Sequence, residues 1–311
     1  MFDRSSIFAI GSLSVVVCFA TIVSAIGCSD GVNTQNTTGT SVGGHGGEGG
    51  VLGSSVGGGG AGMGGDGGLF FPTDGGMPEP ELPAEVYAHS AVALYKIDPT
   101  TKTLKVVDYF QGCGDVTDIA IDKDSNLIAT GFSEMYWIDK NTAKCTFIAS
   151  GSFPNSLSFV PAGILDPNAE VLVGYQNATY VRIDPKTGVM TNIGMLDPGY
   201  FSSGDIVSVK GGATYLTVIG PNCNDCLVEV DPKTGSMLKN WGPLGFSSVF
   251  GLGFWGGSVY GFNESGFMFE VTFPQGVMNV SPNIQFAVAP LDLYYWGAGS
   301  TTVAPVLPPP K

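Results

Sequence analysis

The chain has 311 residues, a formal net charge of −14 and only 13 lysines and arginines, which are spread along the sequence rather than clustered. Nucleic acids and anionic lipid head groups are bound through basic patches. We therefore expect no nucleic-acid partner. The acidic balance favours the solubility of a protein that is displayed in water.

The first 27 residues predict a targeting segment. Arg4 precedes an apolar run from Ile7 to Ile26, and small residues lead up to Cys28. A charged start, an apolar middle and small residues before a cut are typical of a secretory signal peptide. The run Ala-Ile-Gly-Cys that ends at Cys28 resembles the bacterial lipobox, and this resemblance implies that Cys28 becomes the acylated N-terminus of the mature protein.

Two alternatives to a lipoprotein remain open. The segment could be cut elsewhere, which would give ordinary secretion, or it could stay as a membrane span, because about 20 apolar residues can cross a bilayer.

Two to three acyl chains on Cys28 would hold the protein firmly at a membrane. Ser29 follows Cys28 where Gram-negative lipoproteins retained at the inner membrane often have Asp. We therefore expect a cell-envelope protein anchored by lipid at the outer membrane, and otherwise a periplasmic or secreted one.

Residues 28–85 predict the lipid-anchor cysteine and a disordered linker. After Cys28 this segment holds 20 of the 47 glycines, in runs such as GGHGGEGG from Gly43, and almost no large side chain. Glycine-rich chains behave as flexible coils because ordering them costs much backbone entropy. We interpret the segment as a tether.

The chain then repeats a short phrase five times, each at the end of a hydrophobic stretch. The copies read LYKIDPTTKTLKVV from Leu94, MYWIDKNTAKCTFI from Met135, TYVRIDPKTGVMTNI from Thr179, CLVEVDPKTGSML from Cys226 and MFEVTFPQGVMNV from Met268. They align 41 to 47 residues apart on Ile97, Ile138, Ile183, Val230 and Val271. This period is typical of four-stranded propeller blades.

Each of the last four copies follows a predicted strand pair. These pairs begin at Asp115, Asn155, Gly204 and Phe250, with apolar runs of four to eight residues between turn residues. The pattern predicts an all-β, five-bladed β-propeller over residues 86–304. A proline-rich tail follows at 305–311.

The turn residues inside the phrase support hairpins. In the segments 184–188 and 231–235, both Asp-Pro-Lys-Thr-Gly, proline presets its backbone angle, Asp can accept bonds from the backbone just ahead, and Gly takes a positive φ.

Residues 122–126 carry the D-x-D-x-N opening of a calcium loop, but the later glycine and glutamate are missing. We interpret this segment as a polar hairpin tip.

The two ends of the propeller region predict how the ring closes. The region begins on a lone second half, Leu94 to Phe110, and ends on a lone first half from Ile284. An open strand edge invites pairing with other chains. We predict that a C-terminal strand pair joins the N-terminal pair in one composite blade, with Tyr294, Tyr295 and Trp296 on a closing strand.

The phrase L-Y-x-I-D-P-x-T-G-x-x-T-x-I-G resembles the blade repeat of bacterial β-propellers of the YVTN, NHL and quinoprotein-like kind. The resemblance covers about 219 residues. It implies a fold rather than a function, because such propellers include scaffolds, carbohydrate binders and some hydrolases. Lipobox, glycine tether and propeller together resemble a cell-surface lipoprotein of a Gram-negative bacterium.

Four cysteines remain after processing, an even number that predicts disulfides in an exported protein. Cys223 and Cys226 form a CxxC pair in what we interpret as a longer loop, and we expect a local disulfide there. Redox and metal-binding roles are alternatives, although the pair precedes a strand rather than a helix and no second CxxC completes a zinc set. By elimination Cys113 pairs with Cys145, which requires blade twist to bring their Cα atoms within about 7 Å.

Candidate ligands occur where innermost strands begin. Asp118 and Asp205 occupy equivalent places, which Ser156 and Gly251 take in the other copies. Innermost strands line the channel of a propeller, so these carboxylates could hold a cation or orient a sugar. The alternative is that they accept bonds from backbone amides. The tryptophans could likewise form a platform for sugars, but we favour packing between blades for Trp137, Trp241, Trp255 and Trp296.

No catalytic or metal-binding constellation stands out. His89 is the only histidine of the folded region and lies in no nucleophile motif. We therefore assign no catalytic residue, no metal site and no cofactor. The favoured hypothesis is a monomeric, membrane-tethered module that binds or scaffolds a protein or a glycan. The alternative is a metal-dependent hydrolase or lyase with its site in the central channel.

Overall fold

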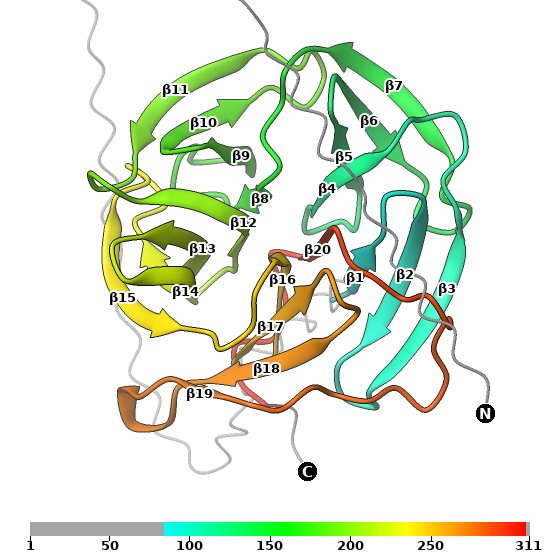
Figure 1. The fold of residues 1–311 in the computed structure, drawn as a ribbon. Coiled ribbons are helices and arrows are strands. Elements are labelled where there is room, and N and C mark those ends of the chain that lie inside the picture. The colour runs from blue at the N-terminus through cyan, green and yellow to red at the C-terminus, as the bar shows by residue number, and fades with distance from the viewer. Residues whose placement is uncertain (1–83, 309–311) are drawn as a thin grey trace, which may run out of the picture. The chain divides into compact units, whose positions relative to one another are not determined.

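The computed structural model describes residues 84–308, which form a ring of five four-stranded antiparallel sheets around a central channel (Figure 1). The prediction of an all-β, five-bladed propeller is confirmed. The only helical element within the described residues is a single 3₁₀ turn, η1 (Pro274–Gly276). No helix in this part of the chain is long and apolar enough to cross a membrane.

Each blade runs from an innermost strand at the channel to an outermost strand at the rim. Blade 1 contains β4 (Val116–Ile121), β5 (Leu127–Gly131), β6 (Glu134–Ile138) and β7 (Cys145–Ser150). Blade 2 contains β8 (Leu157–Val160), β9 (Val171–Gln176), β10 (Thr179–Ile183) and β11 (Met190–Met195). Blade 3 contains β12 (Phe201–Ser208), β13 (Thr214–Gly220), β14 (Cys223–Val230) and β15 (Met237–Pro243). Blade 4 contains β16 (Val249–Trp255), β17 (Ser258–Asn263), β18 (Met268–Thr272) and β19 (Asn279–Val280).

The closing blade contains β20 (Gly297–Ser300), β1 (Val86–His89), β2 (Ala93–Asp98) and β3 (Thr103–Tyr109), in that order from the channel outward. The prediction that both ends of the chain share a blade is correct, but the shares differ. The C-terminal part contributes one strand and the N-terminal part three. The additional N-terminal strand is β1, a short apolar strand that lies before the first copy of the repeat phrase. Tyr294, Tyr295 and Trp296 precede β20 instead of lying on it.

Burial follows the position of a strand in its blade. The innermost strand β8 is buried at every residue, whereas the outermost strand β3 has no buried residue. Apolar side chains form five clusters, one at each junction between neighbouring blades. Tyr295 belongs to the cluster between blade 4 and the closing blade, where its ring lies 5.2 Å from that of Phe262. The core is therefore a ring of packed interfaces between sheets, which explains why each blade needs both neighbours.

The repeat places equivalent residues on equivalent strands. The aligned residues of the five copies lie on the third strand of every blade: Ile97, Ile138, Ile183, Val230 and Val271. The Asp-Pro-Lys-Thr-Gly segments are hairpin turns, as predicted. Asp184 Oδ1 accepts hydrogen bonds from the amides of Lys186 and Thr187, at 2.8 and 3.0 Å, and Gly188 has a φ of 70°. A residue with a Cβ would be strained there.

Residues 122–126 form the polar hairpin tip between β4 and β5. Asp122 Oδ1 accepts bonds from the amides of Asp124 and Asn126, at 2.9 and 2.8 Å, and Asp122 Oδ2 accepts one from Asn126 Nδ2. The Asp122 carboxylate therefore organises its own turn. This agrees with the interpretation of the D-x-D-x-N segment as a turn.

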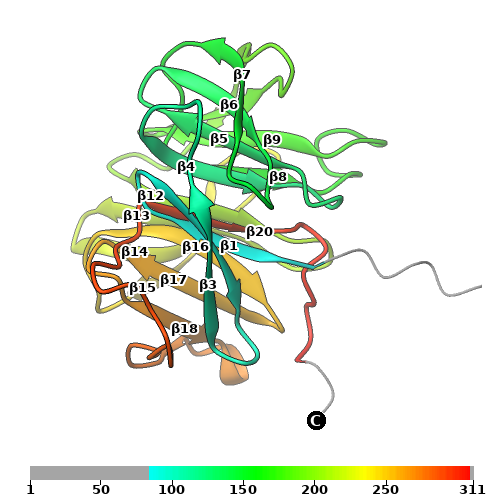
Figure 2. The ribbon, with the colours of Figure 1, turned by 90° about the vertical axis from the view of Figure 1, so that its right-hand side faces the viewer.

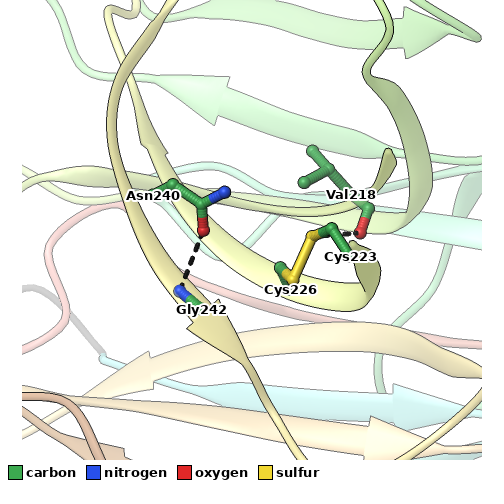
Figure 3. Close-up of a disulfide and its surroundings, with 5 residues drawn as sticks. All are labelled: Val218, Cys223, Cys226, Asn240 and Gly242. Atoms are coloured by element: carbon green, nitrogen blue, oxygen red, sulfur yellow. Dashed lines mark hydrogen bonds between the residues drawn. A yellow bond between two sulfur atoms is a disulfide. The ribbon is translucent and has the colours of Figure 1, made fainter. Parts of the chain in front are cut away.

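Both predicted disulfides are present. Cys113 lies in the β3–β4 connection and Cys145 begins the outermost strand β7, and their Cα atoms are 5.6 Å apart. They meet because the β3–β4 connection runs along the start of β7. The Cys145 amide donates a hydrogen bond to the Gln111 carbonyl, and Lys144 forms a bridge with Gln111. The local pair, Cys223 and Cys226, is drawn in Figure 3.

The place of the CxxC segment differs from the prediction. Cys223 and Cys226 belong to strand β14, which follows a two-residue turn, and not to a longer loop. Between them Asp225 has a φ of 49° and is buried. Its Oδ2 accepts a bond from the amide of Ser248 at 2.8 Å, and its carbonyl accepts one from the amide of Leu244. The disulfide therefore closes a kinked segment that holds the β15–β16 connection in place.

A candidate ligand pocket at the channel mouth

The channel is closed at one end by the segment that follows β20, and we call this end the base. Residues 301–305 contact all five blades. The contacts are Thr301 with Glu85 of the closing blade and Ile121 of blade 1, Thr302 with Glu170 of blade 2 and Lys210 of blade 3, and Pro305 with Gly257 of blade 4. The last of these is a hydrogen bond of 3.2 Å from the Gly257 amide to the Pro305 carbonyl. A ligand cannot pass through a channel whose base is crossed in this way.

The first described residues also lie at the base. Glu85 forms ion pairs with Lys96 at the end of β2 and with Lys140 in the β6–β7 turn. Burial opposes ionisation of this carboxyl, but the two ammonium groups dominate and lower its pKa to about 2. Strands β1 and β20 lie side by side (Figure 2) and are antiparallel, so that Val86 at the start of β1 pairs with Ser300 at the end of β20. Residue 85 and the segment after β20 therefore leave the ring at the same end.

The two predicted channel carboxylates, Asp118 on β4 and Asp205 on β12, join neighbouring blades. Asp118 Oδ2 accepts a bond of 2.6 Å from the amide of Leu157 on β8, and Asp205 Oδ2 accepts one of 2.7 Å from the amide of Leu252 on β16. The Oδ1 atom of each accepts a bond from the amide of the next residue on its own strand. Both side chains are completely buried.

These two carboxyl groups interact across the channel. Burial raises the pKa of Asp118 well above its usual range, and the neighbouring Asp205 raises it further. Burial likewise raises the pKa of Asp205. Like charges in one buried place disfavour a state in which both are ionised. We therefore expect the pair to retain a proton to a higher pH than an ordinary aspartate does.

His89 completes the polar layer inside the channel. Its Nδ1 lies 2.9 Å from the Ser90 carbonyl, and its completely buried Nε2 has no partner among the described residues. A Cβ on Gly297 would stand 2.3 Å from His89 Nε2 and 2.5 Å from Asp118 Oδ1, so only glycine fits at this position. The same two distances mean that His89 Nε2 and Asp118 Oδ1 are no more than about 5 Å apart. Burial lowers the pKa of His89 to about 4. The ring is therefore neutral at physiological pH.

This layer does not favour the metal-dependent hydrolase. Asp118 and Asp205 already accept two backbone bonds each, and both are sealed from solvent. Within residues 84–308 no group of three or more histidine, cysteine and acidic side chains could hold a metal ion. The geometry instead supports the alternative stated from the sequence, in which these aspartates bond backbone amides where strands begin.

The other end of the channel, which we call the mouth, opens into a pocket of about 680 Å³. This volume lies within the usual range for small-molecule sites. Thr117, near the start of β4, lines the pocket, whereas Ile121, at the end of the same strand, lies at the base. The pocket is lined by Thr117, Gly131, Phe132, Ser152, Phe153, Pro154, Asn155, Tyr175, Gln176, Asn177, Phe250, Glu264 and Trp296.

Aromatic side chains from separate connections surround this pocket. Phe132 in the β5–β6 turn is 71% exposed, and its ring lies edge-to-face against that of Trp296, with centroids 6.2 Å apart. Two partly buried rings also line the pocket: Phe153 from the connection before β8, and Phe250 from the start of β16. The exposed ring of Phe132 is not needed for the core and is available to a ligand, whereas Phe153 also packs against the cluster between blades 1 and 2.

The polar groups of the pocket are held differently from those of the channel layer. The side chains of Asn155, Asn177 and Glu264 are exposed and make no hydrogen bond within the described part of the chain. Gln176 uses its Nε2 to donate a bond of 2.6 Å to the Ser152 carbonyl, which fixes its side chain at the pocket wall. The pocket thus presents unpaired amide and carboxylate groups to solvent.

The tryptophans divide between the two roles considered from the sequence. Trp255 donates from Nε1 to a threonine of the β2–β3 turn, and Trp241 packs on Phe273 of blade 4 with centroids 4.5 Å apart. Trp137 packs on the cluster between blades 1 and 2. These three pack between blades, as predicted. Trp296 instead lines the mouth pocket.

The sequence contains a signal for the pocket that the motif search did not use. The repeat aligns Asp118, Ser156, Gly251 and Gly297 in the channel. The residue before each of them lines the mouth: Thr117, Asn155, Phe250 and Trp296. Reading one position back from the channel layer would have found four lining residues, although Gly204, which precedes Asp205 in the remaining blade, does not line the pocket. Of the other predicted sites, Cys28 lies outside the described residues.

Comparisons with known proteins give only distant similarities. No protein-family model matches the chain, and no curated protein does. A protein of unknown function from Bacteroides caccae is 12% identical over 68% of this chain and 77% of its own, with a TM-score of 0.39. The crystal structure of a nidogen/laminin complex gives 8% identity, 70% and 98% coverage and a TM-score of 0.44. BamB from Moraxella catarrhalis gives 11% identity, 62% and 59% coverage and a TM-score of 0.31. Similarities at this level carry no argument about function.

Proposed function

We propose that this protein is a binding module of the bacterial cell envelope. In this proposal an acylated Cys28 anchors the chain in the outer membrane, the glycine-rich segment serves as a tether, and the propeller takes a protein or glycan ligand into the mouth pocket. The propeller itself acts as a rigid support, since buried side chains such as Asp118, Asp205 and Ser158 join neighbouring blades.

The observation that carries the proposal is that the two ends of the ring differ. Residue 85 lies at the base, where the segment 301–305 also closes the channel, and the pocket opens at the mouth. Pocket and attachment therefore occupy different ends of the module, as a displayed binder requires.

The anchoring part is tested by mass spectrometry of protein extracted from membranes. The first residue should be Cys28 carrying two or three acyl chains. A mature chain that starts elsewhere, or that carries no lipid, would contradict the tether and would leave a secreted module.

The binding part is tested with purified full-length protein on arrays of peptides and oligosaccharides. Phe132→Ala removes an exposed pocket ring, and Phe147→Ala removes a ring that is 57% exposed on the outermost strand β7. Binding that Phe132→Ala weakens and Phe147→Ala does not supports the mouth as the binding site. Binding that neither change affects places the site elsewhere, and conversion of a bound probe into product would indicate an enzyme.

A further inference from the structure

The side chains of the mouth pocket restrict the charge of its ligand. Among the thirteen lining residues there is one acid, Glu264, and no lysine, arginine or histidine. Phosphate and carboxylate groups are recognised by cationic side chains or by clustered backbone amides at helix N-termini. The described ring has no such helix, because its one helical element is the turn η1. An anionic ligand would therefore meet no compensating charge.

The polar groups that remain are suited to hydroxyl groups. Asn155 and Asn177 each present a carbonyl oxygen and an NH₂ group that are not bonded within the described chain. An amide can therefore accept from one hydroxyl and donate to its neighbour. Asn177 has a φ of 57°, so the tight β9–β10 turn fixes the position from which its side chain leaves. Neighbouring hydroxyl groups on a rigid ring match this arrangement.

The aromatic groups add a second element of recognition. Trp296 and Phe132 meet edge-to-face, so the ring faces that do not touch each other remain open to the pocket. The face of an aromatic ring carries negative potential, which attracts the weakly positive C–H groups of a saturated ring. One face of a pyranose consists largely of C–H groups, and its rim carries hydroxyls.

The closed base determines which part of a glycan can enter. Residues 301–305 cross the channel end and bond to all five blades, so no chain can thread through the ring. A pocket of about 680 Å³ accommodates a short segment of glycan, and because a glycan that enters it cannot continue through the ring, we expect the end of an oligosaccharide to enter.

A peptide fits this site less well. Extended peptides are usually held by addition to a sheet edge. In this ring the outermost strands that offer edges, β3, β7, β11, β15 and β19, lie at the rim. The pocket is lined instead by turns and by residues at the starts of innermost strands.

We infer that the mouth pocket binds the terminal residues of an uncharged glycan, with a sugar ring stacked on Trp296 or Phe132 and its hydroxyls bonded to Asn155 and Asn177. This inference rests on the proposed function, since it specifies the ligand of the same pocket. It predicts recognition of chain ends without cleavage.

The test measures affinities of detergent-extracted full-length protein for three sets of immobilised probes. The first set is uncharged hexose and N-acetylhexosamine oligosaccharides, the second is the same oligosaccharides ending in a sulfate or carboxylate sugar, and the third is peptides and primary amines. We expect binding within the first set and at least tenfold weaker binding when the terminal sugar is anionic.

Variants connect this binding to the pocket. Phe132→Ala, Asn155→Ala and Asn177→Gly should each weaken glycan binding at least tenfold, and glycine keeps the positive φ at residue 177. Phe147→Ala and Asn141→Ala are the matched controls, because they remove an exposed ring and an exposed amide far from the mouth. Unfolding curves of all five variants establish that each is folded.

Two further outcomes separate the inference from the proposed function. Pocket-dependent binding of an anionic glycan, a peptide or an amine would overturn the glycan inference and leave the binding module standing. If no probe binds in a way that the three pocket variants weaken, both are overturned.

Discussion

The two ends of the channel use polar side chains in opposite ways. At the base and in the layer above it, the carboxyl groups are paired: the partly buried Glu85 with two lysines, and the buried Asp118 and Asp205 with four backbone amides. At the mouth, Asn155 and Asn177 are exposed and unpaired. Paired buried groups stabilise a fold, whereas unpaired exposed groups are free to bind.

The comparison gives a structural role to the two residues that the sequence suggested as ligands. Two carboxylates at equivalent positions of a repeat suggest a ligand site, yet Asp118 and Asp205 close junctions between blades. At two other junctions a hydroxyl has the same role, since Ser158 accepts a bond from an amide of the next innermost strand and Ser300 accepts one from an amide of the preceding innermost strand. The channel layer is therefore a repeated structural joint. Perturbing it should change stability, and perturbing the mouth should change binding.

The largest effect is expected from removing the strand that closes the ring. A chain that ends before Gly297 lacks β20 and the segment that seals the base, so one face of the closing blade and the edge of β1 become exposed. We expect the cooperative unfolding transition to disappear in calorimetry. Deletion of residues 307–311 keeps the bond between Gly257 and Pro305 and should leave the transition in place. Cooperative melting of the longer truncation near the intact temperature would refute this account of closure.

The next effect concerns one joint of the channel layer. Asp205→Ala leaves the buried amides of Ile206 and Leu252 without partners, and each such loss costs about 1–3 kcal/mol. We expect a loss of about 2–6 kcal/mol in urea unfolding. Asp115→Ala is the control, because this exposed side chain precedes β4 and should change stability by less than about 0.5 kcal/mol. Equal losses for the two variants would mean that Asp205 does not join blades.

A pH dependence tests the buried histidine of the same layer. The pKa of His89 is about 4 in the folded protein and about 6.5 in an unfolded chain, so folding disfavours its protonated form. Its contribution is complete above pH 6.5 and is lost as pH falls towards 4, by about 3 kcal/mol. Asp118 and Asp205 act in the opposite direction, because their raised pKa values make their contribution greatest at low pH.

The difference between wild type and His89→Gln isolates the histidine from these carboxyls. Urea unfolding should show that the wild type loses stability relative to the variant between pH 6.5 and 4. A constant difference across this range would show that His89 is not buried as a neutral ring.

Much of the fold was predictable because the repeat specifies it locally. The third strand of each blade carries an apolar run before an Asp-turn, and five such strands at one period predict five blades. The composition of the closing blade was not predictable in the same way. Val86–His89 is only four residues long. The segment from Ile284 forms one strand, β20, instead of a strand pair, and within the described chain its residues 284–296 make a single bridge, between Ile284 and Met268.

The candidate site was less predictable for a physical reason. Phe132, Asn177 and Glu264 lie in two- to four-residue turns, where sequence patterns report the turn rather than the direction of a side chain. Trp296 precedes a strand whose partner is more than 200 residues away in the chain. Only the assembled ring brings these residues to one mouth. The carboxylates were found from the sequence because they occupy equivalent positions in two blades, where each accepts a bond from the next innermost strand.

The smallest effect on stability should come from the mouth. Phe132→Ala removes a ring that is 71% exposed, and we expect the free energy of unfolding to change by less than about 0.5 kcal/mol. The same substitution at Phe262, which is completely buried against Tyr295, should cost about 3–5 kcal/mol. Urea unfolding of both variants measures the contrast. A large loss at Phe132 would make the mouth part of the structural ring, and the distinction between the two ends of the channel would fail.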